Sequence, residues 1–469
     1  MKNSFFFLVF FCAQILNAQI LNVSADSLIK HVNFLAGAEC KGRLPGDIGY
    51  DKAIKYSIDY FKYLGLTGLN DSWLQTFPLE TNIIDDADVV IKIGSEKKVL
   101  KHGYEFSVRG YSGSGKINSK IVFCGYGADL PNYSDYKGVD VKNKIAMVFK
   151  ANPPFIPNLP QYSIRQAADN AYRHGAKGII FISQPNQKNP QKPIGSMMHG
   201  PGPMHADFPQ VQIEVEMAEK IMQDAGYSLS DLQSEIDSKH EPKSICTNSK
   251  AYIFVKATYN PNGETSNVIS VLQGNDDVLK DEYVIIFAHL DHVGFIGDHM
   301  YYPGATDNAS GSAAIYELAR VLSLEKQNIK RSIMFVLFSS EEKGLDGSEY
   351  FVNNLPVPKE KIYAAFNMDC IGYGDTLKAG NGLSCPRLWQ IALEEAAKEN
   401  FIVSKDTWKG GGADLTPFYK AGIDGLYFVN TGAHEYLHLP TDKPETINKD
   451  IFSKMVKWIA NILYRVANE

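Results

Sequence analysis

The sequence predicts an α/β fold in which a mostly parallel central sheet is flanked by helices on both faces. From about residue 265 onward, short apolar runs alternate with longer stretches of helical periodicity, the pattern of parallel strands joined by helices. The apolar runs are continuous, which is typical of strands buried on both faces. Polar side chains directly follow several of these runs, and in such sheets the functional site lies beyond the carboxyl ends of the strands.

Each element of this region follows from its own pattern. Apolar runs predict strands over 283–289, 332–339, 364–369 and 425–429, and helical spacing predicts helices over 308–322, 347–354, 386–399 and 450–466. The last helix carries an apolar stripe formed by Ile451, Met455, Ile459, Ile462 and Val466, which indicates a face buried in the core. Nearer the N-terminus we expect helices over 24–36 and 50–64 and strands over 73–79 and 89–93.

The middle of the chain predicts a separate, small, β-rich domain. Short strands are expected over 120–124, 144–149 and 178–182, with a helix over 163–174. We therefore divide the chain into an N-terminal segment of the main domain (19–112), an inserted domain (113–245) and the rest of the main domain (246–469). Nothing in the insertion has a catalytic pattern, and its segment 197–205 is expected to be a Gly/Pro-rich loop.

Composition excludes several classes of partner. The 469 residues carry a net charge of −6, so no basic field attracts nucleic acid. No apolar run reaches the roughly 18–20 residues needed to span a bilayer. Residues 1–18 combine a charged tip with a short apolar core, which predicts a secretory signal peptide and export to the periplasm or the medium. The five remaining cysteines have no CxxC spacing, so a cysteine zinc site is not expected, and their odd number leaves at least one thiol free.

Potential metal ligands end three successive apolar runs. His289 and Asp291 follow the first, Glu341 and Glu342 the second, and Asp369 the third. Because the carboxyl ends of parallel strands meet at one edge, these side chains should lie close together. Asp307, at the start of a predicted helix, and His438, with Asp442 as a carboxylate that could orient it, complete the set.

The donor types indicate zinc. The five ligands His289, Asp307, Glu342, Asp369 and His438 offer nitrogen and oxygen donors, which suit zinc, with cobalt or manganese as substitutes. Five side chains exceed the three that a single catalytic zinc usually takes, and they fit two metals if one carboxylate bridges. Glu341 is then the general base, and Asp291 the carboxylate behind His289.

The same segments carry a resemblance to a known family. The stretches 288–292, 304–311, 340–348, 367–372 and 438–442 resemble the co-catalytic zinc aminopeptidases of metallopeptidase family twenty-eight. That family also includes glutamate carboxypeptidase, the transferrin receptor and glutaminyl cyclase. The insertion resembles the protease-associated domain of secreted peptidases. Two departures concern the substrate pocket: Leu415 stands where relatives often have histidine, and Asp424-Gly425 replaces a common Pro-Ala.

The resemblance implies a zinc aminopeptidase fold and a role for each ligand. His289 and Asp369 would hold one zinc, Glu342 and His438 the other, and Asp307 would bridge them. A cis peptide bond is implied between Asp307 and Asn308.

The implied activity is that of a secreted metallo-aminopeptidase. A metal-bridged hydroxide would attack the peptide carbonyl, with Glu341 as general base. A glutaminyl cyclase-like acyl transferase and a carboxypeptidase on the same scaffold are the alternatives, and a non-enzymatic receptor-like relative is a further one. Tyr427, Phe428 and the loop 410–412 are candidates for the wall of the substrate pocket.

Overall fold

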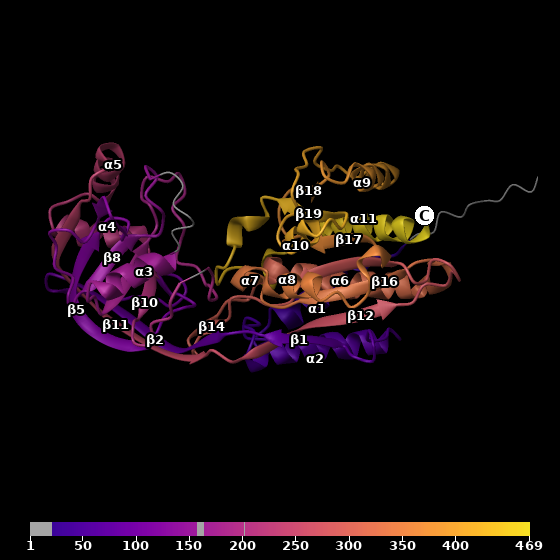
Figure 1. Ribbon diagram of the computed structural model, residues 1–469, viewed down its shortest axis with the longest axis horizontal. Coiled ribbons are helices and arrows are strands. Elements are labelled where there is room, and N and C mark those ends of the chain that lie inside the picture. The colour runs from indigo at the N-terminus through magenta and orange to yellow at the C-terminus, as the bar shows by residue number, and fades with distance from the viewer. Residues whose placement is uncertain (1–20, 157–163, 201) are drawn as a thin grey trace, which may run out of the picture.

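The computed structural model describes residues 21–156, 164–200 and 202–469. The predicted signal peptide, residues 1–18, lies outside the described residues. Figure 1 shows two lobes joined by long strands. The larger lobe contains residues 21–79 and 261–469, and the inserted lobe contains residues 80–260, so the chain leaves the larger lobe once and returns to it.

The larger lobe is built on a seven-stranded sheet in the order β1-β12-β16-β13-β17-β19-β18. The four central strands β16, β13, β17 and β19 are mutually parallel. Only β12 and β18 run opposite to the other five, so the predicted α/β fold with a mostly parallel sheet is confirmed. The strands are β1 (Leu74–Pro78), β12 (Glu264–Leu272), β13 (Tyr283–His289), β16 (Ser332–Phe338), β17 (Ile362–Met368), β18 (Thr376–Gly380) and β19 (Gly425–Thr431).

Helices cover both faces of this sheet. On β13, Val284, Ile286 and Ala288 face one side, where they share a core with α1, α2, α6, α9 and α11. Ile285 and Phe287 face the other side, where they pack with residues of α8 and α10. This two-sided burial explains why the strand reads as an unbroken apolar run.

The helical bounds lie close to the predicted ones. Ser24 caps α1 by accepting a hydrogen bond from the Ser27 N–H at 3.2 Å. The helix predicted from residue 308 begins at Ser310 instead, because a π-helical turn (Ala305–Ala309) precedes it. The helices of the larger lobe are α1 (Ala25–Leu35), α2 (Ile48–Tyr63), α6 (Ser310–Leu324), α7 (Glu341–Gly344), α8 (Asp346–Asn353), α9 (Pro386–Lys398), α10 (Leu415–Lys420) and α11 (Lys449–Asn468), with short 3₁₀ turns at Lys326–Asn328, Lys359–Lys361, Ala433–Tyr436 and Pro444–Thr446.

The inserted lobe has an eight-stranded sheet in the order β3-β2-β11-β5-β8-β9-β10-β4. It extends beyond the range 113–245 because β2 and β11 pair over most of their length and connect the lobes. Its strands are β2 (Thr81–Ile93), β3 (Glu96–Val99), β4 (Phe106–Val108), β5 (Gly115–Cys124), β8 (Ile145–Phe149), β9 (Gly178–Ile182), β10 (Gln210–Ile213) and β11 (Ser244–Asn260). Its helices are α3 (Ile164–Arg173), α4 (Val215–Asp224) and α5 (Leu229–Lys239). Two small hairpins complete the fold, β6 (Asp129–Leu130) with β7 (Tyr133–Ser134) and β14 (Phe295–Ile296) with β15 (Met300–Tyr301).

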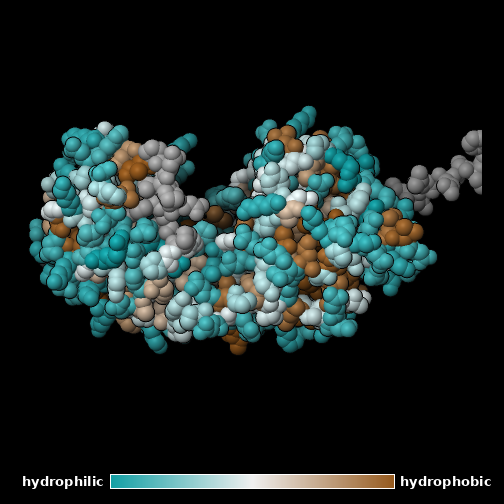
Figure 2. Space-filling view, in the orientation of Figure 1, coloured by the Kyte–Doolittle hydropathy of each residue, from teal (hydrophilic) through white to brown (hydrophobic). Residues whose placement is uncertain are grey.

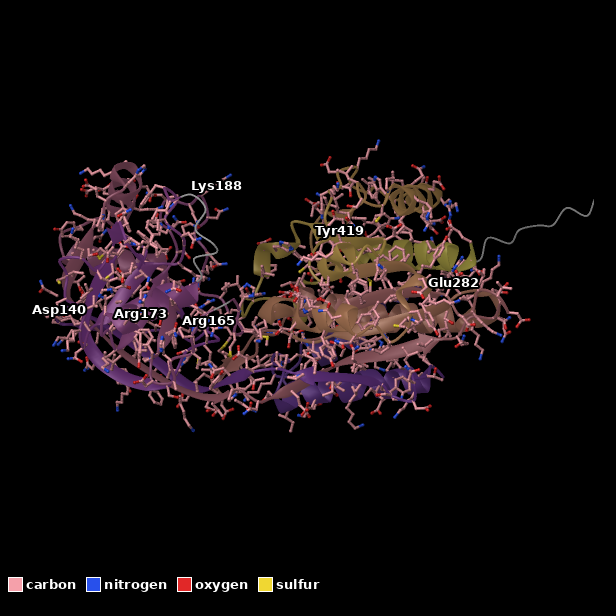
Figure 3. All side chains as sticks on the ribbon, viewed as in Figure 1. Asp140, Arg165, Arg173, Lys188, Glu282 and Tyr419 are labelled. Atoms are coloured by element: carbon pink, nitrogen blue, oxygen red, sulfur yellow. The ribbon has the colours of Figure 1, made fainter. Side chains whose placement is uncertain are left out.

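Two predictions about the whole chain can be compared with the described residues. Within residues 21–156, 164–200 and 202–469, no helix combines the length and apolar content needed to cross a bilayer. The five cysteines in these ranges are all free thiols, and Cys370 is buried. Figure 3 shows charged side chains distributed over the surface of both lobes, for example Asp140, Arg173 and Glu282.

Candidate metal centre

The candidate ligands meet at one edge of the larger sheet. His289 ends β13, Asp369 directly follows β17, and Glu341 and Glu342 open the short helix α7 that follows β16. Because these three strands are parallel neighbours, their carboxyl ends place the side chains together. Asp307 comes from the π-helical turn before α6, and His438 from the loop after the 3₁₀ turn Ala433–Tyr436.

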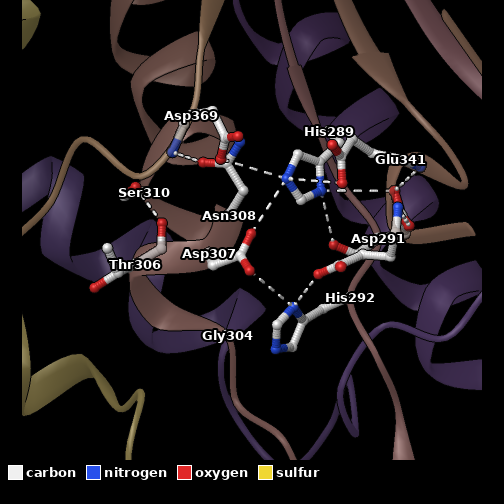
Figure 4. A network of polar contacts seen from close by, with 12 residues as sticks. His289, Asp291, His292, Gly304, Thr306, Asp307, Asn308, Ser310, Glu341 and Asp369 are labelled. Carbon is white, nitrogen blue, oxygen red and sulfur yellow. Dashed lines mark hydrogen bonds and ion pairs between the residues drawn. The ribbon is translucent and has the colours of Figure 1, made fainter. Parts of the chain in front are cut away.

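Asp307 lies at the centre of the cluster, as Figure 4 shows. Its Oδ1 is 3.3 Å from His289 Nε2, which in turn is 3.5 Å from Asp369 Oδ1. Its Oδ2 is 3.1 Å from His438 Nε2, which is 2.8 Å from Glu342 Oε2. The two oxygens of one carboxylate thus face two separate sets of donors. The Asp307–Asn308 peptide bond is cis, as the family resemblance implied.

The donors fit divalent metal ions. His289 Nε2 and Asp369 Oδ1 are buried and, within the described chain, have no hydrogen-bond partner, which is costly unless something absent from the protein atoms binds them. Ligand atoms around a tetrahedral zinc at about 2.1 Å lie roughly 3.4 Å apart, close to the separations on the His289 side. Two groups of donors are close enough to hold an ion, namely His289, Asp307 and Asp369, and His292, Asp307 and Glu342.

His292 was given no role from the sequence, although it stands inside one of the quoted stretches. It is fully buried, and its Nδ1 is 2.7 Å from Glu342 Oε1, the carboxylate oxygen that does not face His438. Its Nε2 has no partner among the described residues. His292 therefore either orients Glu342 or is an additional ligand on that side. Its position three residues after His289 was the only available clue.

The carboxylate of Asp291 lies behind His289, as expected, and has a second contact. His289 Nδ1 is 3.7 Å from this carboxylate and 3.2 Å from the Asp291 backbone carbonyl. The carboxylate also accepts hydrogen bonds from the N–H groups of Glu341 and Glu342, at 3.2 and 3.3 Å. Asp291 thus fixes the start of α7, where an anion interacts favourably with the free N–H groups.

Asp442 contacts the backbone and not His438, the partner that we expected. Its carboxylate accepts hydrogen bonds from the backbone N–H groups of Thr306 and Asp307, at 2.9 to 3.1 Å, and no bond to His438 is observed among the described residues. Asp442 therefore positions the turn that presents Asp307. The backbone of His438 has a left-handed conformation, with a φ of 55°.

A buried arginine links the loops of the site. The guanidinium of Arg43 is fully buried and donates only to backbone carbonyls: Leu290 at 2.8 Å, Leu35 at 2.7 Å, Pro303 at 2.9 Å and Gly304 at 2.9 Å. Leu290 lies between His289 and Asp291, and Gly304 precedes the turn that contains Asp307. Arg43 thus connects the backbones that carry ligands from two parts of the chain.

The site has strongly perturbed electrostatics. Burial raises the pKa of Glu341 well above its ordinary value, and the nearby carboxylates of Asp414 and Asp369 act in the same direction. Burial also raises the pKa of Asp414 to about 7. Burial acts against ionisation of Asp307, yet the nearby imidazoles of His289 and His438 hold its pKa well below the usual value. The cluster therefore combines a proton-accepting group with carboxylates that stay ionised, a combination found at functional sites.

The centre opens into a pocket between the two lobes, in a region where Figure 2 shows the surface hollowed. Its volume is about 450 Å³, and five of its lining residues come from the inserted lobe: Arg109, Ile194, Gly195, Ser196 and His199. The Gly195 N–H donates to the carbonyl of His438 at 3.0 Å. Tyr427 lines the pocket as expected, whereas Phe428 is buried in the core and the loop 410–412 is not part of this lining.

Known proteins are similar to this chain in sequence and in fold. Residues 267–463 match Peptidase family M28. The aminopeptidase YwaD of Bacillus subtilis is 28% identical over 340 residues, which are 69% of this chain and 62% of that protein, so the chain spans less than two thirds of this relative. Among solved structures, an aminopeptidase from Aneurinibacillus sp. strain AM-1 superposes with a TM-score of 0.65 at 22% identity, covering 95% of both chains. BSAP, a zinc aminopeptidase from Bacillus subtilis, superposes with a TM-score of 0.66 at 21% identity, covering 95% and 96%.

The fold, the buried donors and the sequence match all concern the larger lobe. This lobe is an α/β domain with a candidate metal centre at the carboxyl edge of its sheet. Residues 267–463, which lie in this lobe, are similar to Peptidase family M28.

Proposed function

We propose that this protein is a zinc-dependent exopeptidase, an aminopeptidase that removes N-terminal residues from peptides. The observation that carries the proposal is the convergence of His289, Asp307, Asp369, Glu342 and His438 around one buried carboxylate. The aminopeptidase names of the relatives and the family match support the same activity.

The residues divide into metal ligands and a base. We assign His289 and Asp369 to one zinc, Glu342 and His438 to a second, and Asp307 to both. Zinc bound by these donors would supply a Lewis acid that polarises the scissile carbonyl and acidifies a water molecule. Glu341 Oε2 lies beside the cluster, 4.0 Å from His289 Nε2.

Glu341 is the proton carrier in this proposal. Its raised pKa, caused mainly by burial, brings the carboxyl toward the range where it can both accept and return a proton. It would take the proton of the attacking water and deliver it to the leaving amine. Asp291 supports this step because it holds the N–H groups of Glu341 and Glu342.

Glu341→Gln tests the assignment. The variant should keep its zinc and its fold but lose turnover of an aminoacyl-p-nitroanilide by at least about 100-fold, the lower end of a general base's contribution. The matched control is Glu349→Gln in α8, a position outside the pocket lining. A Glu341→Gln enzyme that retains full activity contradicts the assigned base.

A substrate panel separates the proposal from its alternatives. Aminopeptidase action requires cleavage of peptides with a free N-terminus and none of N-acetylated ones. Release of C-terminal residues would indicate a carboxypeptidase. Cyclisation of N-terminal glutamine by a protein that holds one zinc per chain would indicate a cyclase. An intact fold that binds zinc but processes none of these substrates would favour a receptor-like relative.

Export is part of the proposal. The composition of residues 1–18 supports delivery to the periplasm or the medium, and the inserted lobe would be a protease-associated domain. Cell fractionation with a C-terminal epitope tag tests the first point: full-length protein in the cytosol would contradict it.

A further inference from the structure

The two lobes contribute residues of opposite charge to the pocket at the metal centre. The acidic lining residues of the larger lobe are Asp307, Glu341, Glu342 and Asp369, whereas the inserted lobe contributes Arg109. Arg109 follows β4 and belongs to no motif that pointed to function. A residue so placed can contact a substrate that is also bound at the metal centre.

Arg109 is a buried cation without an anion. The residue is 5% exposed, and within the described chain its Nε has no hydrogen-bond partner. Its Nη1 donates at 3.2 Å to the side-chain oxygen of Gln212, which is a neutral acceptor, and its Cζ lies 6.0 Å from the centre of the Tyr111 ring. Buried charges in proteins are normally paired with opposite charges, and neither of these contacts is with an anion.

A second cation lies on the same acceptor. Lys150 Nζ donates to the same Gln212 oxygen at 3.0 Å and to the Gln191 side chain at 2.6 Å. Burial, together with the charge of Arg109, lowers the pKa of Lys150 well below its ordinary value. An anion beside these two groups would relieve both their desolvation and their mutual repulsion.

The backbone holds Arg109 in place before any ligand arrives. The Arg109 N–H donates to the Gln210 carbonyl at 3.0 Å, and the Gly110 N–H donates to Ser196 Oγ at 3.0 Å. A Cβ at position 110 would lie 2.3 Å from the Ser196 carbonyl oxygen, so this turn is packed directly on a loop that also lines the pocket. A preorganised donor of this kind loses little entropy on binding.

We propose that Arg109, supported by Lys150, binds a carboxylate of the substrate, so that the pocket selects short peptides that carry one near the scissile bond. The inference rests on the proposed function and adds a substrate class to it. The carboxylate is either the free C-terminus of a di- or tripeptide or an aspartate or glutamate side chain. The volume of about 450 Å³ suits a ligand of that size, because small-molecule pockets span roughly 300–1,000 Å³. Guanidinium is the cation best shaped to grip a carboxylate through two bonds.

Binding without turnover tests the anchor directly. Isothermal titration of the zinc-loaded Glu341→Gln protein compares two ligand pairs: Leu-Gly-Gly with its C-terminal amide, and Leu-Glu-amide with Leu-Gln-amide. In at least one pair the carboxylate ligand should bind about tenfold more tightly or better, as expected for a hydrogen-bonded charge pair. A preference in the first pair identifies the C-terminus as the anchored group, and a preference in the second identifies an acidic side chain.

Substitutions of Arg109 test whether this residue causes the preference for the carboxylate ligand. In the Glu341→Gln protein, adding Arg109→Met should abolish the preference. Adding Arg109→Lys should reduce it, because lysine keeps the charge but not the planar guanidinium group. The control is Arg173→Met, on α3 of the inserted lobe and labelled in Figure 3, which should leave the preference unchanged. Equal binding within both pairs, or a preference that survives Arg109→Met, overturns the inference.

Failure of the proposed function gives a different result. If zinc-loaded wild-type protein cleaves the two members of each pair equally well, the peptidase stands and the anchor is wrong. If it cleaves none of the four ligands while the binding preference is present, the anchor stands and the peptidase assignment is wrong.

Discussion

Replacing Arg43 by methionine should destabilise the larger lobe and weaken its metal centre together. Arg43 makes four hydrogen bonds to buried carbonyls, all between 2.7 and 2.9 Å. Methionine fills a similar space but donates nothing. The Gly304 carbonyl keeps its bond from the Ala309 N–H at 3.1 Å, whereas the carbonyls of Leu35, Leu290 and Pro303 lose the arginine as a donor. Each such loss costs about 1–3 kcal/mol. The lower limit for three is about 3 kcal/mol, a large part of the roughly 5–15 kcal/mol that stabilises a typical protein.

The effect on zinc follows from which carbonyls are involved. Leu290 is adjacent to His289, and Gly304 lies three residues before Asp307. Freeing these segments should weaken zinc binding about 10- to 100-fold, the usual cost of losing a group that orients metal ligands.

The assay is urea unfolding of metal-free protein, followed by zinc titration against a chelator. Arg173→Met is the control, because Arg173 is a 55% exposed side chain paired with Asp169 on the surface, and such changes usually stay within about 0.5 kcal/mol. The reasoning is refuted if Arg43→Met lowers the free energy of unfolding by less than about 1 kcal/mol and leaves the zinc affinity unchanged.

Three further predictions concern single side chains. Asp442→Asn should weaken zinc binding about tenfold or more, because the carboxylate that accepts from the Thr306 and Asp307 N–H groups is lost; an unchanged affinity in chelator competition would speak against this. His292→Asn should still bind two zinc ions per chain, but more weakly, if His292 orients Glu342; metal analysis that finds one ion would make it a ligand instead. Burial lowers the pKa of His31 to about 4, whereas an unfolded histidine has a pKa of about 6.5. Between these two values the unfolded chain binds more protons, so the stability of the fold decreases as the pH drops from 6.5 to 4, by up to about 3 kcal/mol. His31→Phe should remove this decrease; urea unfolding at pH 4.5 and 7 that shows the same pH dependence in both proteins would contradict the assignment.

The central sheet was predictable because its strands are buried on both faces. The strand predicted at 283–289 matches β13, and the ends of β13, β16 and β17 bring the expected ligands to one edge. Antiparallel β12 was not predicted. Its buried Asn267 and Ser270 interrupt the apolar pattern, and Asn267 bonds to the Gly347 carbonyl, a contact 80 residues away in sequence.

The predicted strand at 89–93 captured only part of β2, for a related reason. β2 begins at Thr81, and the acidic residues Asp85, Asp86 and Asp88 hide its start. These three residues are partly exposed. At such positions, contacts with the rest of the fold determine whether the chain forms a strand, and the residue types alone do not.

The positioning groups of the site could not be predicted, because they act through the backbone. Asp291 and Asp442 were expected to orient imidazoles, the usual partners of a carboxylate near a metal-binding histidine. Asp291 does lie beside His289, but both carboxylates accept hydrogen bonds from backbone N–H groups, and only the path of the chain reveals those donors. The inserted lobe's part of the pocket was missed likewise, since a Gly/Pro-rich loop has no periodicity that indicates where it packs.

The account depends most directly on the number of metal ions and on the carboxylate between them. Metal analysis of zinc-saturated, dialysed protein should find two ions per chain in the wild type and fewer than one and a half in Asp307→Ala, because Asp307 faces both donor groups. Two ions in both proteins, or none in the wild type, would contradict it.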